Sequence, residues 1–326
     1  MRLVWMIGVG LAFAAAAAQG ETVPMAGIYA AGADAPSRAR SIAIADFSGR
    51  GGERLAFAID TALRGAVIGG EPYFALTFTA PAFGDSYTYD GNPQAPAVSR
   101  GPDAVLRGIA EIEWRDVDDG TREIEECAAK DDKGKCLEKK KVNVPCRARQ
   151  VTLRPEVRLV AREGDLLYGK GDTLTASQRF CQNDEGKPSV DSMVEELARG
   201  FADAVRRDLA PEFRAEDIRV LESRKGMSKP DQAAFKAALR LTKTDVAEAC
   251  AMFGELKAAN PQSVTLLFNT GLCIERLGEL DTAAELYEQA LAISPRKLEP
   301  REGLARVASR LRAQQQLALH YGDSGR

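Results

Sequence analysis

Apolar and polar positions alternate with two different periods in this chain, and the change of period divides it into two parts. Residues 41–222 combine short apolar runs and period-two alternation with amphipathic helical segments, whereas residues 228–320 keep a helical period throughout. The pattern predicts an α+β domain over 41–222, with an α/β start followed by a long antiparallel hairpin. It predicts an all-α domain of helical repeats over 228–320.

The α/β start has the order strand, helix, strand. Ser41–Phe47 is a short apolar run, and apolar residues then recur every four positions from Leu55 to Val67. This spacing predicts a helix with one buried face, ended by Gly69-Gly70. Tyr73–Ala80 is rich in aromatic and β-branched residues and predicts the next strand. The three elements together have the size of a βαβ unit.

A loop and the long hairpin follow. Residues 81–103 carry prolines and glycines without a period, so they predict a long loop that is either functional or disordered. The other elements predicted for this domain are strands at Val105–Val117, Val142–Ala161 and Leu166–Phe180, a helix at Ser189–Leu209 and a short strand at Ile218–Leu221.

The first twenty residues (1–20) predict a signal peptide. An apolar run from Leu3 to Ala18 follows Arg2; it is shorter than the roughly 20 residues of a membrane-spanning helix and ends in small residues. An uncleaved anchor is the alternative. No cysteine follows the run, so we expect no lipid anchor and a periplasmic protein secreted across the inner membrane. Residues 21–40, rich in Ala, Gly and Pro, predict a disordered lead-in.

All six cysteines lie after the predicted signal peptide, where an even number indicates disulfides. A turn between Cys127 and Cys136, and the near register of Cys146 with Cys181 across the hairpin, favour these two pairs. The alternative pairing joins Cys127 to Cys146 and Cys136 to Cys181. A zinc site is disfavoured, because the Cys-x₂₋₄-Cys spacing of structural zinc sites is absent.

Two stretches of the helical part repeat each other 34 residues apart, because Ala249, Phe253 and Pro261 recur as Ala283, Tyr287 and Pro295. Small residues let two helices cross closely, an aromatic fills the space between them, and proline ends the second helix. The pattern resembles the tetratricopeptide repeat (TPR). Cys250 and Cys273 fall in buried slots on neighbouring helices of this repeat, either as a disulfide or as a buried free pair.

The resemblance to TPR repeats implies a binding surface. In that family the first helix of each pair lines a concave groove, which here gives repeats at about 230–263 and 264–297 and a capping helix after them. The residues that the resemblance places on or near the groove, as partner-binding residues, are Asp231, Leu241, Thr265, Phe268, Asn269, Leu272 and Arg276. An exposed Phe268 would anchor a protein partner. The alternative is that Phe268 and Leu272 pack on another part of the chain.

Three short patterns in the α+β part resemble a family of periplasmic proteins. They are Ile42–Phe47 with Gly51-Gly52, Leu55 and Leu63; Asp103–Gly108; and Arg158–Val160 with Gly164–Tyr168. The family is that of the curli-secretion lipoproteins, similar in fold to the TolB amino-terminal domain and to outer-membrane activators of penicillin-binding proteins. The chain departs from it by lacking a lipobox cysteine, by having a loop in place of the second helix and by a cysteine-bearing insertion. The resemblance implies a non-enzymatic role in the cell envelope.

Catalytic and nucleic-acid functions are disfavoured by the composition. His320 is the only histidine and falls in a tail predicted to fray, so a histidine-dependent catalytic or metal site lacks a histidine in an ordered position. Lys and Arg number 44 against 47 Asp and Glu, which argues against nucleic acid as the main partner. We expect no cofactor and no metal. Lys139, Lys140 and Lys141 predict at most a weak contact with an anionic surface, and a solvated hairpin is the favoured alternative.

The functional prediction is an exported, non-enzymatic adaptor or scaffold of the bacterial cell envelope that binds a protein or peptide partner through its repeats. Two alternatives come from other classes. One is a regulator of an envelope synthase or secretion system that acts through the α/β domain. The other is a hydrolase that uses carboxylates alone, which requires two acids from distant segments to converge.

Overall fold

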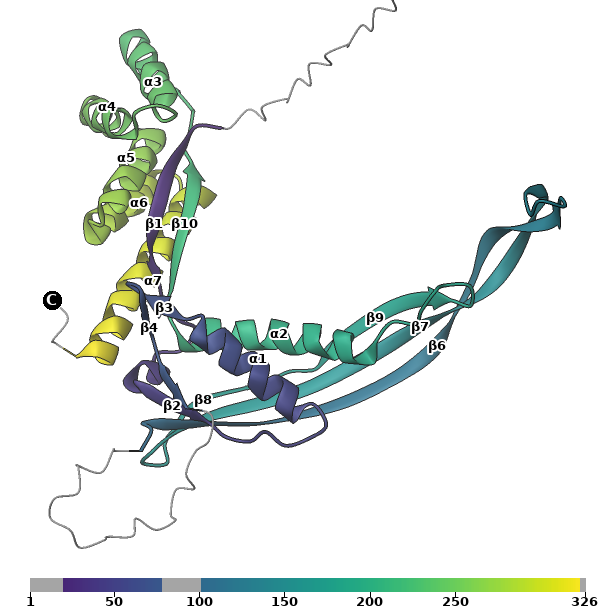
Figure 1. The fold of residues 1–326 in the computed structure, drawn as a ribbon. Helices are drawn as coiled ribbons and strands as arrows, with labels where there is room; N and C mark the ends of the chain where they lie inside the picture. The colour runs from purple at the N-terminus through teal and green to yellow at the C-terminus, as the bar shows by residue number, and fades with distance from the viewer. Residues whose placement is uncertain (1–19, 78–100, 323–326) are drawn as a thin grey trace, which may run out of the picture. The chain divides into compact units, whose positions relative to one another are not determined.

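The computed structural model describes residues 20–77 and 101–322. They divide into two compact units, whose elements are drawn in Figure 1. The helical unit comprises residues 20–27 and 214–308, and the sheet unit comprises residues 28–213 and 309–322. Residues 1–19 of the predicted signal peptide and 81–100 of the predicted loop lie outside the described residues.

The sheet unit begins with a parallel group of strands. β2 (Ser41–Ile44) lies between β5 (Ala75–Thr77) and β6 (Ala104–Lys130) and is parallel to both. In this register Ile42 lies beside Ala104 on one side and beside Leu76 on the other. The strand predicted from Ser41 is therefore present, and the one predicted at 73–80 is present at 75–77; residues 78–80 are not among the described residues.

An antiparallel group completes the same sheet. β7 (Cys136–Ala161) pairs with β6 along most of its length, and β8 (Leu166–Gly171) and β9 (Leu174–Cys181) both pair with β7. The strand predicted at 142–161 thus begins earlier, and the one predicted at 166–180 is divided in two. Gly164, with a φ of 97°, occupies the turn between β7 and β8, as the sequence predicts.

Two helices, α1 (Gly52–Arg64) and α2 (Val190–Leu209), pack on one face of this sheet (Figure 1). Their apolar faces and the inner face of the sheet form one buried core. α1 ends at Arg64 rather than at the predicted Gly69-Gly70. Those two glycines, both with positive φ, instead form the turn between the short strands β3 (Val67–Ile68) and β4 (Glu71–Pro72).

β6 and β7 continue past the other strands as a two-stranded ribbon (Figure 1). A ribbon of two strands buries little apolar surface and is marginal by itself. Here ion pairs join the strands: Lys141 pairs with Glu123 at 2.8 Å, and Lys139 pairs with Glu125 at 2.9 Å. Cross-strand pairs of opposite charge contribute roughly 0.2–1 kcal/mol each, so they add to the backbone ladder of β6 and β7 where the ribbon lacks a core.

Disulfides fasten the ribbon at two places. Cys127 is joined to Cys136 at its end, and Cys146 on β7 is joined to the directly opposed Cys181 on β9. This confirms the favoured pairing. The pairing of β7 with β8 shifts in register between Leu159 and Val160, whereas β7 and β9 pair in one continuous register from Cys146 to Leu153.

The helical unit contains a strand where disorder is predicted. β1 (Thr22–Tyr29) forms a two-stranded sheet with β10 (Glu212–Arg219), and a short 3₁₀ helix, η1, follows at Ala35–Arg38. The prediction of a disordered lead-in at 21–40 is wrong, because Val23 and Met25 are buried. Their partner strand comes from a distant part of the sequence, so no local pattern reveals it.

The first four helices of this unit follow in consecutive pairs, α3 with α4 and α5 with α6, and α7 begins in this unit and ends in the sheet unit. Their bounds are Lys229–Leu241 for α3, Val246–Ala259 for α4, Val264–Leu277 for α5, Leu280–Ile293 for α6 and Leu298–Tyr321 for α7. Ser228, Asp245 and Ser263 cap α3, α4 and α5 by accepting a hydrogen bond from a backbone N–H of the first turn. Within the described residues, no helix combines the length and the apolarity needed to cross a bilayer.

Two glycines leave room for the ring of Tyr287, the aromatic residue of the second repeat. A Cβ at Gly271 of α5 would lie 2.6 Å from the Tyr287 ring, and one at Gly303 of α7 would lie 2.7 Å from it, so only glycine lets these helices approach the ring. The Tyr287 hydroxyl donates to the buried Glu275 at 2.7 Å, which also pairs with Arg306 at 2.9 Å. The third disulfide, Cys250–Cys273, joins α4 to α5. Of the two predicted states of these cysteines, the disulfide is therefore present and the buried free pair is not.

Gly271→Ala is expected to lower the free energy of unfolding by about 1–3 kcal/mol, because the new methyl group overlaps the buried Tyr287 ring. The matched control is Gly254→Ala in α4, where nothing lies within 4 Å of the added Cβ. That change removes a helical glycine and is expected to be neutral or to stabilise by up to about 1 kcal/mol. Urea unfolding of both variants measures the difference; equal stabilities would contradict the packing described.

Candidate functional site

A groove of about 1310 Å³ runs between α1 and α2 on the sheet unit. The first turns of the two helices lie together, because Arg54 pairs with Asp191 at 2.7 Å. The lining side chains include Phe57, Ala58, Thr61 and Ala62 of α1, Gly65 just after it, and Glu195, Ala198, Arg199, Asp203 and Arg206 of α2. The groove therefore has an apolar floor and charged edges.

The floor is formed mainly by alanines, whose small side chains leave space where larger side chains of the two helices would interdigitate. Ala56 and Ala198 are buried, and Ala58 and Ala62 are half-buried. Phe57 projects beside this floor and is 66% exposed. Leaving such a side chain in water rather than burying it costs roughly 1.5–3 kcal/mol. An exposed aromatic next to an apolar depression is typical of a contact site for another protein.

The α2 edge of the groove carries a regular row of charges. Glu195, Arg199 and Asp203 are exposed at intervals of one helical turn, and Arg206 continues the row while also contacting Glu212. The signs alternate along the helix. Arginine flanking an aromatic is a composition that protein interfaces favour.

Sequence reasoning did not single out Phe57, although a signal was present. The apolar face of α1 is fixed by Leu55, Ile59 and Leu63, all buried. Phe57 lies instead on the same side of the helix as Glu53 and Thr61, and all three side chains are exposed. An aromatic on the polar face of an amphipathic helix is the pattern that points to this site.

The side chains predicted to line an open groove in the repeats are mostly buried by the chain itself. Phe268 is 1% exposed and packs against Tyr287 with ring centroids 5.7 Å apart, and Leu272 is fully buried. Thr265 and Asn269 are also buried. The expectation of an exposed aromatic anchor on this face is wrong, because α5 is covered on both sides within its own unit.

Asn269 shows what covers that face. The backbone N–H of Leu221 donates to Asn269 Oδ1 at 2.8 Å, and Asn269 Nδ2 donates to the Leu221 carbonyl oxygen at 2.9 Å. The extended segment after β10 thus occupies the position in which a partner peptide was expected. Both contacts satisfy backbone groups, which explains a fully buried amide at this position.

The remaining predicted residues do not converge on one surface. Asp231 is half-buried and accepts a hydrogen bond from Asn260 at 3.1 Å, and Leu241 is half-buried. Arg276 is exposed and lies by a smaller pocket of about 530 Å³ between it and residues of β1 and β10. The seven residues therefore do not form the single exposed patch that the resemblance implies.

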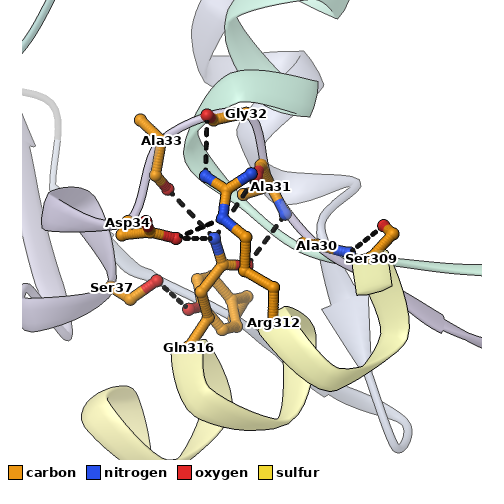
Figure 2. A network of polar contacts seen from close by, with 10 residues as sticks. Ala30, Ala31, Gly32, Ala33, Asp34, Ser37, Ser309, Arg312 and Gln316 are labelled. Carbon is orange, nitrogen blue, oxygen red and sulfur yellow. Dashed lines mark hydrogen bonds and ion pairs between the residues drawn. The ribbon is translucent and has the colours of Figure 1, made fainter. Parts of the chain in front are cut away.

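The end of α7 from Ser309 on belongs to the sheet unit and is held there by polar contacts, so it is not frayed (Figure 2). Arg312 Nε and Gln316 Nε2 both donate to Asp34 Oδ1 at 2.7 Å. Gln316 Oε1 accepts from the backbone N–H of Ala31 at 2.8 Å. The Arg312 guanidinium, followed by the Gln316 amide, holds the pKa of Asp34 below its usual value.

His320 belongs to the same docked helix, which corrects the prediction of a frayed tail. It is 2% exposed and stacks on Tyr73 with ring centroids 3.9 Å apart. Its Nε2 lies 2.6 Å from the Tyr73 carbonyl oxygen and its Nδ1 lies 3.3 Å from that of Ser37. Burial lowers the pKa of this imidazole. With both ring nitrogens facing backbone carbonyls, His320 has a structural role.

The three disulfides indicate an extracytoplasmic protein, since such bonds persist in oxidising compartments. No group of three or more His, Cys, Asp or Glu side chains that could hold a metal occurs in residues 20–77 and 101–322. Lys139 and Lys141 are engaged in ion pairs across the ribbon. A contact of Lys139, Lys140 and Lys141 with an anionic surface stays a prediction.

No family model and no curated protein matches this chain. Several solved structures are similar to it, and two of them match about half its length. One is a homologue of the neuraminyllactose-binding hemagglutinin from Helicobacter pylori, with a TM-score of 0.26, 8% identity, and coverage of 53% of this chain and 82% of that one. The other is a minor lipoprotein from Acinetobacter baumannii, with a TM-score of 0.24, 13% identity, and coverage of 52% and 91%. At these TM-scores the likeness carries no argument about function.

Asn269→Ala is expected to lower the free energy of unfolding by about 1–3 kcal/mol, because it leaves both backbone groups of Leu221 without a partner. Asn269→Asp keeps the size but places a second oxygen against the Leu221 carbonyl, so it should be at least as destabilising. Urea unfolding measures both. Parental stability in the two variants would contradict a structural role for this amide.

The stability of the fold is expected to fall as the pH drops below about 6.5, the ordinary pKa of histidine. Since burial depresses the pKa of folded His320, the unfolded chain takes up the proton first. The stabilisation is complete above the unfolded pKa and is lost as the pH falls through the folded one. His320 is the only histidine, so urea midpoints at about pH 7.5 and 5.5 isolate it. A slope that persists in His320→Gln would contradict the assignment.

Proposed function

We infer that this chain is an extracytoplasmic, non-enzymatic scaffold that binds another protein through the α1–α2 groove. The observation that carries the inference is the exposure of Phe57 beside an alanine floor with charged edges. Aromatic and arginine side chains around an apolar depression supply affinity at the centre and orientation at the rim.

The predicted adaptor role is kept, but the binding site moves from the repeats to the sheet unit. Phe268 and Leu272 are covered, and Asn269 already holds the backbone of Leu221. This favours the alternative of a protein that acts through its α/β part, such as a regulator of an envelope synthase or secretion system. Helical pairs of the TPR type would then serve to hold the extended segment after β10, which contains Leu221.

A cell-envelope location and the absence of catalysis are parts of the same proposal. The disulfides support export, and a ribbon that depends on them needs an oxidising compartment. His320, the one histidine, is enclosed by backbone carbonyls and offers no free nitrogen for proton transfer.

A photo-crosslinking amino acid at Thr61 tests the proposal in cells that make the protein. Thr61 is exposed and lines the groove, whereas Glu196 is exposed on α2 outside it and gives the control position. We expect one defined protein adduct from position 61 and none from position 196.

The adduct should depend on the aromatic side chain. Phe57→Ala is expected to reduce it about tenfold or more, as for the loss of an interface anchor. Phe213→Ala is the matched control, because Phe213 is 64% exposed but lies outside the groove. Equal adducts from positions 61 and 196, or adducts insensitive to Phe57→Ala, would reject the groove as a docking site.

A further inference from the structure

The charged side chains on the α2 edge of the groove alternate in sign, so that their order is complementary to its own reverse. Glu195, Arg199, Asp203 and Arg206 are spaced by four, four and three residues, which keeps them on one side of the helix, and all four line the groove. Their signs run minus, plus, minus, plus. A row with this order, placed antiparallel against a copy of itself, meets an opposite charge at every position.

We propose that the occupant of the groove is a second copy of this chain, related by a twofold axis that passes beside α2, between the two copies, at the level of residue 201. The proposal rests on the proposed function, because it takes the α1–α2 groove as a protein-docking surface. In the pair, Arg199 faces the partner's Asp203, and Asp203 faces the partner's Arg199. The interface is isologous, so each contact occurs twice.

The apolar part of the groove fits the same axis. Arg54 and Asp191 bring the first turns of α1 and α2 together, and Phe57 lies one turn further along α1. Phe57 is therefore at the Glu195 end of the groove. The twofold axis carries it to the Arg206 end of the partner's groove. Each copy thus offers one exposed aromatic side chain that the pair would bury.

The two kinds of contact have different roles in this arrangement. Exposed ion pairs add little affinity, but they reject partners and orientations that bring like charges together. Burial of Phe57 and the alanine floor supplies the affinity. Because Arg206 is already engaged with Glu212, the central pair of Arg199 and Asp203 decides the orientation.

Charge reversal in the full exported chain tests the arrangement by sedimentation. Arg199→Asp places two aspartates opposite each other in both halves of the pair, and Asp203→Arg does the same with two arginines. Each variant alone is expected to weaken self-association by about 100-fold. An equimolar mixture of the two variants restores every pair and should associate like the parent chain. The double variant Arg199→Asp/Asp203→Arg should do so by itself.

Controls separate this result from misfolding and from loss of the groove itself. Glu196→Lys changes an exposed charge on α2 outside the groove and is expected to leave association unchanged. Circular dichroism of each variant checks the fold, and a variant that fails to fold leaves the double variant as the deciding sample. A parent chain that is monomeric at about 100 μM, or a mixture no better than the single variants, overturns the proposal.

The crosslink from Thr61 distinguishes the proposed docking site from the proposal that a second copy occupies it. A product with twice the mass of the chain supports both the docking site and the second copy. A Phe57-dependent adduct with a different protein, together with a monomeric chain, keeps the docking site and overturns the self-association. Absence of any adduct from position 61 rejects both.

Discussion

The hydrogen-bonded ladder between β6 and β7 is the interaction on which the sheet unit depends. Among the described strands, β6 joins the parallel strands β2 and β5 to the antiparallel strands β7, β8 and β9. α1 and α2 rest on the surface that these strands form together, and the groove exists only because the two helices share that support. Opening the ladder would therefore remove the site as well as the sheet.

Most regular elements could be predicted because the interactions that define them are local. The four-residue spacing of Leu55, Ile59 and Leu63 specifies both a helix and its buried side. The turn between Cys127 and Cys136 brings two thiols together over a short length of chain. β1 was not predicted, because Pro24 and Gly27 interrupt its alternation of apolar and polar residues and its partner strand is far away in sequence.

The candidate site was harder to predict for a related reason. Periodicity shows that a side of α5 is buried but not what buries it, so Phe268 and Leu272 fitted either a partner or the chain's own strand segment. His320 likewise receives its environment from Ser37 and Tyr73, which lie far from it in sequence. Phe57 needed no long-range information: its place on the polar side of α1 was already visible in the spacing.

The bond between Cys127 and Cys136 also affects how the chain responds to proteolysis. The turn that it encloses is exposed and contains Lys133 and Lys135, both suitable for a trypsin-like enzyme. A cut at either lysine leaves the two fragments covalently joined beside an intact ladder. The nicked molecule would migrate as one species in electrophoresis until a reductant released its halves.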